Sequence, residues 1–282
     1  MQQLILKVNK LQQLTSGIKR FEFVSPVGDD LPVFTAGAHL DFHLDNGLIR
    51  SYSLANNPEE SNRYVTAVLR EETGGGGSKY MHDNVSVGDE LKVTGPSNNF
   101  ELADIPGTHI LLGGGIGITP LLAMGHKLKA ENRPCHLHYC TKSREETAFV
   151  EEVEEIFGDN LTFYHDGGDP SKGINLKETI GVQTIDANLY ICGPTGLLSA
   201  ARDVTSHWTV GSVHFELFQS TKSKEEKAAE AKLDNRNQAF EVELAQSGRT
   251  LMIPEDKSIL QVLWENEIEV LHACEEGWCG NC

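Results

Sequence analysis

A cation, an aromatic ring and a hydroxyl stand close together near residue 50 of the sequence. They belong to the segment Arg50-Ser51-Tyr52-Ser53-Leu54, whose pattern is typical of extended chain. A bound flavin needs these three groups: a fixed charge for its phosphate, a surface against which its ring packs, and a polar contact near its N5 atom. The alternative is a strand with an incidental arginine, and the five residues alone do not separate the two.

A run of four glycines, residues 74–77, leads through Ser78 into a predicted helix at residues 79–82. Main-chain N–H groups at a glycine-rich turn before a helix form an anion site. A glycine run can also be a flexible loop. Because this turn and the Arg50 segment occur in one predicted barrel, together they favour a bound flavin.

A second glycine-rich run, GGGIGITP at residues 113–120, lies between a predicted strand and a predicted helix. Its glycines allow the main chain to approach a pyrophosphate closely, and Pro120 suits the first turn of a helix. The run does not match the Gly-x-Gly-x-x-Gly fingerprint well, and CTKSR at residues 140–144 replaces the acidic residue of that fingerprint. Alone, it is a weak indication of a dinucleotide site.

The segment Tyr190-Ile191-Cys192-Gly193-Pro194 ends a later strand of the same predicted sheet. Open α/β sheets bind their ligands at the carboxyl ends of their strands. This position makes the segment a candidate for the same ligand site. Taken by itself, Cys192 is interpreted as a small buried residue.

Three cysteines crowd into the end of the sequence. Cys274, Cys279 and Cys282 have the spacing Cys-x4-Cys-x2-Cys, which is that of plant-type [2Fe–2S] proteins. Such a cluster takes four thiolates, and Gly277 and Gly280 would let the loop wrap around it. A zinc site more often uses Cys-x2-Cys pairs, so the spacing favours iron–sulfur over zinc.

Two sheets are predicted to position these motifs. Residues 1–100 read as short strands, such as residues 4–8, 18–23 and 64–69, separated by turns; this pattern predicts a small antiparallel barrel. From residue 109 strands and helices alternate, which predicts a doubly wound parallel sheet. Its predicted strands are residues 109–112, 135–140, 161–165, 188–192 and 212–218, and its predicted helices include residues 120–129 and 144–157.

The last part of the chain has a different character. Residues 219–238 carry many charges and no aromatic residue, which predicts a linker. A hairpin at residues 240–244 and 250–253 and an amphipathic helix at residues 258–266 are predicted ahead of the cysteines.

Composition excludes some functions. A length of 282 residues predicts two or three domains. Because 41 acidic residues outnumber 24 Lys and Arg, for a net charge of −17, and no basic stripe is present, nucleic acid is excluded as a partner. No stretch has the length and apolarity of a membrane anchor or signal core, so we expect a cytoplasmic protein with no membrane partner. Cys135, Cys140 and Cys192 are expected to be buried free thiols.

In their order and spacing, the RSYSL segment, the two glycine runs, the Cys-Gly-Pro turn and the cysteine triplet resemble the phthalate dioxygenase reductase family. This family includes vanillate demethylase and carnitine monooxygenase reductases, and the likeness covers the whole chain. It implies a multidomain fold with four segments: an FMN-binding antiparallel β-barrel (1–101), a ferredoxin-reductase-like α/β domain for NAD (102–218), a linker (219–238), and an incomplete β-grasp ferredoxin domain (239–282).

The resemblance also implies a role for each motif. Arg50 would hold the FMN phosphate, Tyr52 would pack on the ring, and Ser53 would lie near N5. The implied catalytic residues are Ser53, Thr119 and Cys192. The implied cofactor-binding residues are Arg50, Tyr52, Ser53, Leu54, Gly76, Gly77, Ser78, Gly114, Gly115, Gly117, Thr119, Cys192, Gly193, Pro194 and Phe218. The implied ligands of the [2Fe–2S] cluster are Cys274, Cys279 and Cys282.

The activity implied by the resemblance is that of a reductase that passes electrons from NADH through FMN to the cluster and on to a Rieske-type oxygenase. Family members continue past the third cysteine to a fourth ligand, so we expect the cluster to be absent or unstable in this chain. Two alternatives stay open. One is a stand-alone NAD(P)H flavin reductase, with Lys142 and Arg144 at a 2′-phosphate; the other is a non-redox, zinc-binding interaction module.

Overall fold

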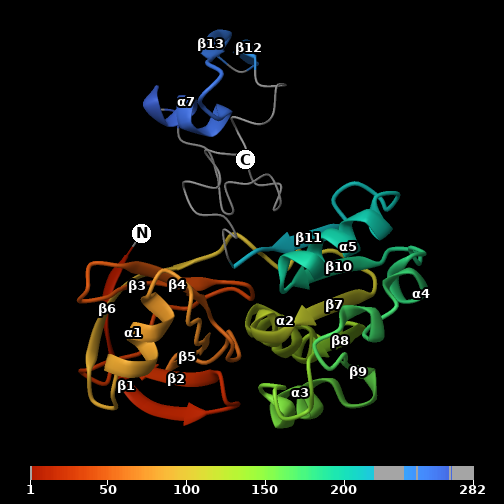
Figure 1. Cartoon of the computed structure of the whole chain (residues 1–282). Coiled ribbons are helices and arrows are strands. Elements are labelled where there is room, and N and C mark those ends of the chain that lie inside the picture. Colours follow the sequence, from red (N-terminus) through yellow and green to blue (C-terminus); the bar gives the residue numbers. More distant parts are fainter. Residues whose placement is uncertain (1, 219–237, 246, 267, 269–282) are drawn as a thin grey trace. The chain divides into compact units, whose positions relative to one another are not determined.

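The computed structural model describes residues 2–218, 238–245, 247–266 and 268 (Figure 1). The chain divides into two compact units, Met1–Glu216 and Leu217–Cys282. Within the described residues, no helix has the length and apolar character that crossing a membrane requires.

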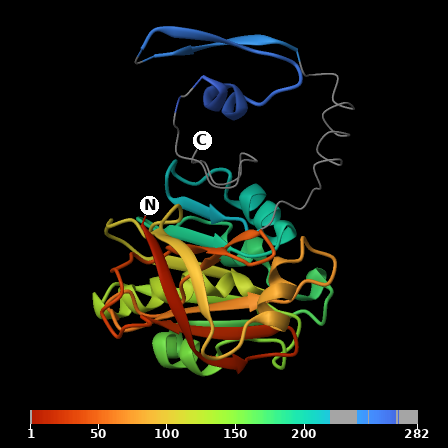
Figure 2. The same ribbon diagram turned by 90° about the vertical axis from the view of Figure 1, so that its left-hand side faces the viewer.

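A six-stranded antiparallel sheet forms the first half of the first unit (Figures 1 and 2). In spatial order its strands are β4 (Ile49–Ser53), β3 (His39–His43), β6 (Glu90–Ser97), β1 (Gln3–Gln13), β2 (Ile18–Val24) and β5 (Tyr64–Leu69). Alternate residues such as Phe21 and Phe23 are fully buried, as a sheet with one face on a core requires. The end strands β4 and β5 contact each other, and α1 (Gly77–Asn84) packs on β5. The predicted antiparallel flavin-domain sheet is confirmed.

A five-stranded parallel sheet forms the second half of the first unit. Its strands, in spatial order, are β11 (Val213–Glu216), β10 (Asn188–Cys192), β7 (His109–Gly114), β8 (Cys135–Thr141) and β9 (Leu161–His165). The connecting helices are η1 (Gly115–Gly117), α2 (Ile118–Ala130), α3 (Val150–Phe157), η2 (Gly158–Asn160), η3 (Pro170–Lys172), α4 (Leu176–Ile180) and α5 (Thr195–Thr205). The strand order reverses between β7 and β10, so the carboxyl ends of these two strands form a topological switch point, where such sheets bind ligands.

One predicted helix is shorter than expected. Residues 144–157 were expected to be helical, but α3 begins only at Val150. The side chain of Thr147 donates to the carbonyl of Ser143 at 2.8 Å, and the main-chain N–H of Thr147 bonds to Arg144, so a turn replaces the first helical hydrogen bond. Phe149 then takes a left-handed conformation with φ of 58°, directly before the helix.

The two halves of the first unit share one hydrophobic core, which includes Phe42 of the barrel and Leu121 of α2. The segment between them is held by polar contacts. The hydroxyl of Tyr190 accepts a hydrogen bond from the N–H of Ala103 at 3.0 Å, and Arg133 donates to the Ala103 carbonyl at 3.0 Å. The domain boundaries at residues 101, 218 and 238 stay predictions.

The second unit contains a hairpin and a short helix in its described part. Strands β12 (Phe240–Leu244) and β13 (Arg249–Ile253) pair antiparallel, and α7 (Ile259–Glu265) packs on β13. Ser258 and Gln261 form a capping box that starts α7. The hairpin and helix agree with the sequence prediction.

Candidate active site

Arg50, in β4, packs against the glycine turn that precedes α1. Its guanidinium donates to the carbonyl of Gly75 at 3.0 Å and to that of Ile49 at 2.7 Å. A guanidinium carries five N–H donors, and the other three make no hydrogen bond within the described residues. A side chain at Gly77 would come within 2.7 Å of the Arg50 Nε atom. The structure therefore brings together the predicted cation and the predicted phosphate turn, and the absence of side chains on the turn makes room for both.

The turn itself leads into the first residues of α1, where main-chain N–H groups have no partner within the helix. Gly76 has φ of 81°, a left-handed conformation that glycine adopts freely, and directly precedes the first residue of α1. The hydroxyl of Ser78 accepts a hydrogen bond from the N–H of Glu71 at 3.1 Å, which closes the turn. N–H groups at the beginning of α1 and the Arg50 guanidinium together suit a phosphate.

Tyr52 supplies a buried polar atom that has no partner. Its ring lies 5.6 Å from that of Phe42, centroid to centroid. Its hydroxyl is buried and makes no hydrogen bond within the described residues. Burial raises the pKa of this phenol to about 12, so it is a neutral donor near pH 7. Because an unsatisfied buried donor costs about 1–3 kcal/mol, a bound group with an acceptor atom fits this position.

Ser53 lies at the end of β4, beside the middle of β5. The hydroxyl of Thr66 in β5 donates to the Ser53 carbonyl at 2.8 Å, while the Ser53 hydroxyl makes no hydrogen bond within the described residues. The next residue, Leu54, is fully buried and donates to the Ala38 carbonyl at 2.8 Å. Since β5 also contacts η1, the end of β4 is brought near the glycine run of the parallel sheet.

The two glycine-containing loops of the parallel sheet touch at its topological switch point. Cys192 pairs with Gly113 in the register of β10 and β7. A Cβ atom added at Gly114 would lie 2.6 Å from Pro194 Cδ, and one added at Gly117 would lie 2.7 Å from the Gly193 nitrogen. Only glycine permits so close an approach of the two loops. The structure therefore places together most of the residues that were predicted to hold the nicotinamide dinucleotide.

Two side chains fix the shape of this glycine run. The Thr119 hydroxyl donates to the carbonyl of Ile116 at 3.1 Å, so this predicted catalytic group is engaged within its own turn. The Tyr139 hydroxyl donates to the carbonyl of Gly115 at 3.1 Å. Gly115 itself has φ of 53°. A turn held in this way is already formed before any ligand binds.

Cys192 is fully buried and lies beside an acid. Its thiol donates toward Oε2 of Glu216, the last residue of β11, at 4.0 Å. Burial raises the pKa of the Glu216 carboxyl to about 8, and burial together with Glu216 raises the pKa of the Cys192 thiol well above its usual value. The thiol is therefore protonated, which rules out a nucleophilic role and fits a contact residue.

Lys142 and Arg144 follow β8 and are both exposed. Lys142 lies 3.9 Å from Glu146, and Arg144 lies 3.5 Å from Glu154. Exposed ion pairs of this kind are weak. The two cations could therefore exchange these carboxylates for a phosphate at small cost.

Several predicted residues are not placed at this site. Phe218 follows β11 and belongs to the second compact unit. Cys274, Cys279 and Cys282 lie outside the described residues. Among the described residues, no group of three or more His, Cys, Asp or Glu side chains could hold a metal ion.

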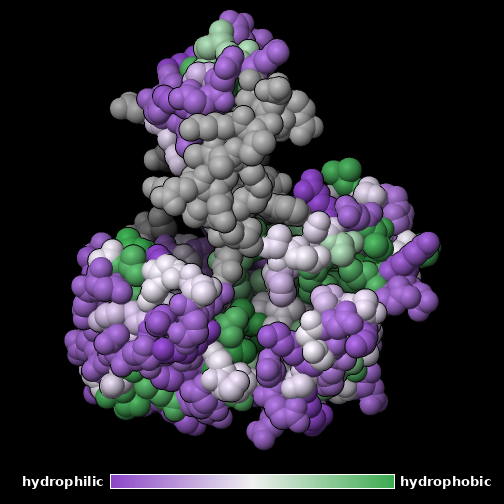
Figure 3. All heavy atoms as spheres, in the orientation of Figure 1, coloured by the Kyte–Doolittle hydropathy of each residue, from purple (hydrophilic) through white to green (hydrophobic). Residues whose placement is uncertain are grey.

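Hydrophobic surface gathers where the two halves of the first unit meet, as Figure 3 shows. Partly buried apolar residues that pack on the shared core include Leu48 of the barrel and Ile116 of η1. Apolar walls with a few polar groups are typical of sites for flat cofactors.

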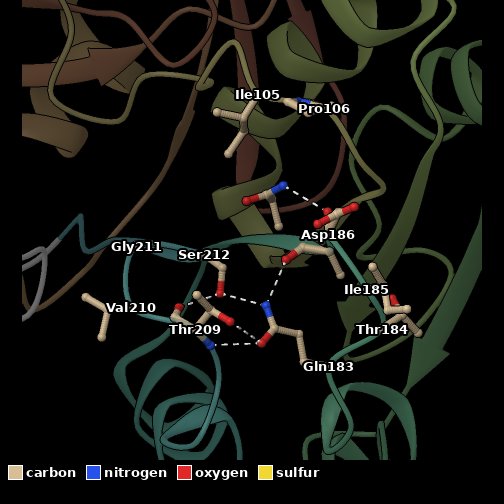
Figure 4. A pocket seen from close by; sticks show the side chains of 12 residues that line it. Ile105, Pro106, Gln183, Thr184, Ile185, Asp186, Thr209, Val210, Gly211 and Ser212 are labelled. Atoms are coloured by element: carbon tan, nitrogen blue, oxygen red, sulfur yellow. Dashed lines mark hydrogen bonds between the residues drawn. The ribbon is translucent and has the colours of Figure 1, made fainter.

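A separate hollow of about 550 Å³ lies at the opposite edge of the parallel sheet (Figure 4). Its lining residues precede β7, β10 and β11, whereas the glycine loops follow these strands. Gln183 joins two of its loops: it donates to Ser212 Oγ at 3.0 Å and accepts from the Thr209 N–H at 2.8 Å. This hollow is therefore not the predicted dinucleotide site.

Comparison with known proteins identifies the family. The model of the oxidoreductase FAD-binding domain matches residues 5–102, which contain β2–β6 and nearly all of β1. The phthalate 4,5-dioxygenase oxygenase reductase subunit of Pseudomonas putida is 42% identical over 279 residues, which cover 98% of this chain and 83% of that protein. The chain belongs to the phthalate dioxygenase reductase family.

Other members of the phthalate dioxygenase reductase family agree. Vanillate O-demethylase oxidoreductase of Acinetobacter baylyi is 35% identical, over 98% of this chain and 84% of its own. A solved structure of phthalate dioxygenase reductase, described as a modular structure for electron transfer from pyridine nucleotides to [2Fe–2S], matches with a TM-score of 0.77 and 38% identity, over 99% of this chain and 85% of that one. The chain is a flavin-binding oxidoreductase that transfers electrons, and the predicted family and enzyme class are confirmed.

Three residues that shape this site belong to none of the motifs predicted from the sequence. The Thr66 hydroxyl reaches a main-chain carbonyl of β4 and the Tyr139 hydroxyl one of η1, and no local pattern marks such contacts. Glu216 had a signal: it is the one acidic residue in the largely apolar segment VHFELF, residues 213–218. A charge among apolar residues of a strand suggests a titratable group with a raised pKa.

Proposed function

We propose that this chain belongs to a reductase that takes electrons from NADH, passes them through FMN to a plant-type [2Fe–2S] cluster, and delivers them to the oxygenase component of a Rieske-type system. The observation that carries the proposal is the meeting of the two glycine loops at the switch point of the parallel sheet, while β5 joins this point to Ser53 at the end of β4. A hydride donor held by the loops would face a flavin held by the barrel.

The described residues fit an FMN. Arg50 has three unused N–H donors beside a side-chain-free turn, and Tyr52 has an unsatisfied buried hydroxyl. Bound FMN and NADH would supply the hydride and single-electron chemistry, so the protein's part is to position and tune. Arg50, Gly76, Gly77 and Ser78 would bind the phosphate. Tyr52 and Leu54 would support the ring, and the free hydroxyl of Ser53 would contact N5.

The nicotinamide side would be shaped by the loops. Gly114, Gly115 and Gly117 would admit the dinucleotide close to the main chain, with Thr119 holding the turn. Cys192, Gly193 and Pro194 would form the opposite wall, where the neutral thiol excludes water and adds no charge near the nicotinamide. Phe218 would complete the flavin side. The preference for NADH over NADPH rests on the family resemblance.

The remaining parts of the proposal concern the cluster and the partner. Cys274, Cys279 and Cys282 would be cluster ligands, in keeping with their spacing. The relatives' names, a phthalate dioxygenase reductase subunit and a vanillate demethylase oxidoreductase, favour an oxygenase as the electron acceptor. A cytoplasmic location, where NADH is available, belongs to the same proposal.

Released flavin and steady-state rates test the proposal. Heat-denatured protein should release FMN and no FAD, and kcat/KM should be higher with NADH than with NADPH. FAD as the sole flavin would contradict the FMN assignment. A higher kcat/KM with NADPH would instead assign Lys142 and Arg144 to a 2′-phosphate. A flavin that is not retained by the protein but binds and leaves as a substrate would favour a stand-alone flavin reductase.

A further inference from the structure

Arg20, in β2 of the barrel, reaches across to α3 of the parallel-sheet half. Its guanidinium donates to Oε1 of Glu152 at 2.9 Å. The same guanidinium lies 5.9 Å from the centre of the Phe149 ring. The side chain of Arg20 is 19% exposed and that of Glu152 34% exposed, so the pair is better shielded than a free surface ion pair.

The barrel end of this contact leads to the candidate flavin site. Arg20 pairs with Ala67 in the register of β2 and β5. Ala67 follows Thr66, whose hydroxyl binds the carbonyl of Ser53. Arg20 therefore lies on the strand next to β5, opposite the residue that follows Thr66, and Thr66 is the residue that bonds β5 to the end of β4.

The other end leads to the candidate dinucleotide site. Phe149 is 4% exposed and holds φ of 58°, a strained conformation for a large side chain that its surroundings must maintain. Its neighbour Ala148 places its main chain against the hydroxyl of Tyr139, and this hydroxyl donates to the Gly115 carbonyl in η1. A shift of the Phe149 segment would therefore displace the Tyr139 hydroxyl and, through it, the Gly115 carbonyl of η1.

We propose that Arg20 is a positioning residue for hydride transfer. By holding Glu152 and Phe149 it fixes the separation between the end of β4, where the flavin ring would lie, and η1, where the nicotinamide would lie. The inference rests on the proposed function but adds a residue that contacts neither cofactor. Hydride transfer depends steeply on the distance between its two atoms, so a small displacement of the halves should slow it while leaving each binding site intact.

A charge-swap series tests this role. The variants are Arg20→Glu, Glu152→Arg and the double exchange, with Arg20→Gln as a milder change should Arg20→Glu not fold. Lys127→Ala is the matched control, because Lys127, in α2, forms its ion pair at 2.7 Å with Glu131, the C-cap residue of the same helix. Each purified protein is assayed for flavin content, for the dissociation constant of NADH, and for the limiting rate of flavin reduction by NADH in anaerobic stopped flow.

We expect Arg20→Glu and Arg20→Gln to keep their flavin and their NADH affinity, while the limiting reduction rate falls by about 10- to 100-fold. The charge-transfer absorbance of the nicotinamide–flavin complex should weaken in parallel, and hydrogen–deuterium exchange should rise in residues 148–157. The double exchange should recover most of the rate, and Lys127→Ala should behave as the unchanged protein.

The inference is overturned, and the proposed function left standing, by a limiting rate and charge-transfer band unchanged in both Arg20 variants, or by no recovery in the double exchange. An equal fall of the limiting reduction rate in Lys127→Ala would also contradict the inference, because the loss of any ion pair would then slow the reaction. If NADH fails to reduce the flavin of the unchanged protein, the proposed function itself fails, and the inference fails with it.

Discussion

The carboxyl of Glu216 lies 4.0 Å from the thiol of Cys192, at the carboxyl ends of two neighbouring strands, β11 and β10. Cys192 is fully buried and Glu216 is partly buried, and burial raises both pKa values, that of Glu216 to about 8. Near pH 7 the Cys192 thiol and the Glu216 carboxyl, which lie beside the two glycine loops, therefore carry little net charge. A neutral wall suits the uncharged nicotinamide ring of NADH.

This pair predicts how stability depends on pH. The Glu216 pKa is raised above its ordinary 4.5, so the folded protein holds a proton that the unfolded chain releases between pH 4.5 and about 8. Its contribution to the free energy of unfolding is therefore complete below pH 4.5 and is lost as pH rises to about 8, by at most about 1.4 kcal/mol per pH unit. Urea unfolding across this range should show the decline, and Glu216→Gln should flatten it. Equal slopes in both proteins would contradict the assignment.

Arg50→Ala should weaken flavin retention. It removes a charge-assisted phosphate contact, and such contacts contribute about 1.5–3 kcal/mol, or about 10- to 100-fold in affinity. Fluorescence titration of the flavin-free protein with FMN measures the change. Arg63→Ala is the matched control, because Arg63 also lies in the barrel but binds Glu22 and Glu60. Equal FMN affinity in Arg50→Ala and the unchanged protein would remove Arg50 from the site.

Gly117→Ala should damage the parallel-sheet half. Its new methyl group would lie 2.7 Å from the Gly193 nitrogen, so one loop must move, at a cost of about 1–3 kcal/mol. We expect a lower melting temperature and a raised KM for NADH. Gly196→Ala is the control, since nothing lies within 4 Å of the added atom and alanine favours the helix α5. A wild-type KM in Gly117→Ala would show that the loops need not meet so closely.

Ser53→Ala should retain flavin but slow its reduction by NADH. The Ser53 carbonyl, not its hydroxyl, makes the structural hydrogen bond to Thr66, so the fold should be unaffected. One hydrogen bond to N5 contributes about 0.5–1.5 kcal/mol, so we expect the rate of reduction to fall by about 2- to 10-fold. Thr66→Val, which breaks the structural bond, should instead lower the melting temperature. A Ser53→Ala protein that is reduced at the normal rate would exclude the hydroxyl from the reaction.

Much of the fold follows from local pattern. Alternating apolar residues set the strands of the barrel, and the alternation of strands with helices set the parallel sheet, because both patterns act over a few residues. The glycine runs could also be predicted to be sites of close approach, because two main-chain segments can come this close only where the residues have no side chain. Their meeting at one switch point follows from topology once the sheet is predicted.

The failures involve contacts between distant residues. The turn before α3 depends on the Thr147 hydroxyl taking the Ser143 carbonyl, a competition between side chain and main chain that helix propensity does not describe. The contact of Arg20 with Glu152 joins residues in different halves of the first unit. No spacing in the sequence indicates such a pair, because it exists only after both sheets have packed.

The reduction of bound flavin by NADH is the measurement on which the account depends. Purified protein should carry one FMN per chain, and anaerobic NADH should bleach its absorbance within the time of catalysis. NADPH at the same concentration should act more slowly. A chain that binds no flavin, or whose flavin remains oxidised with excess NADH, would contradict the proposal that β4 and the two glycine loops form one site for hydride transfer.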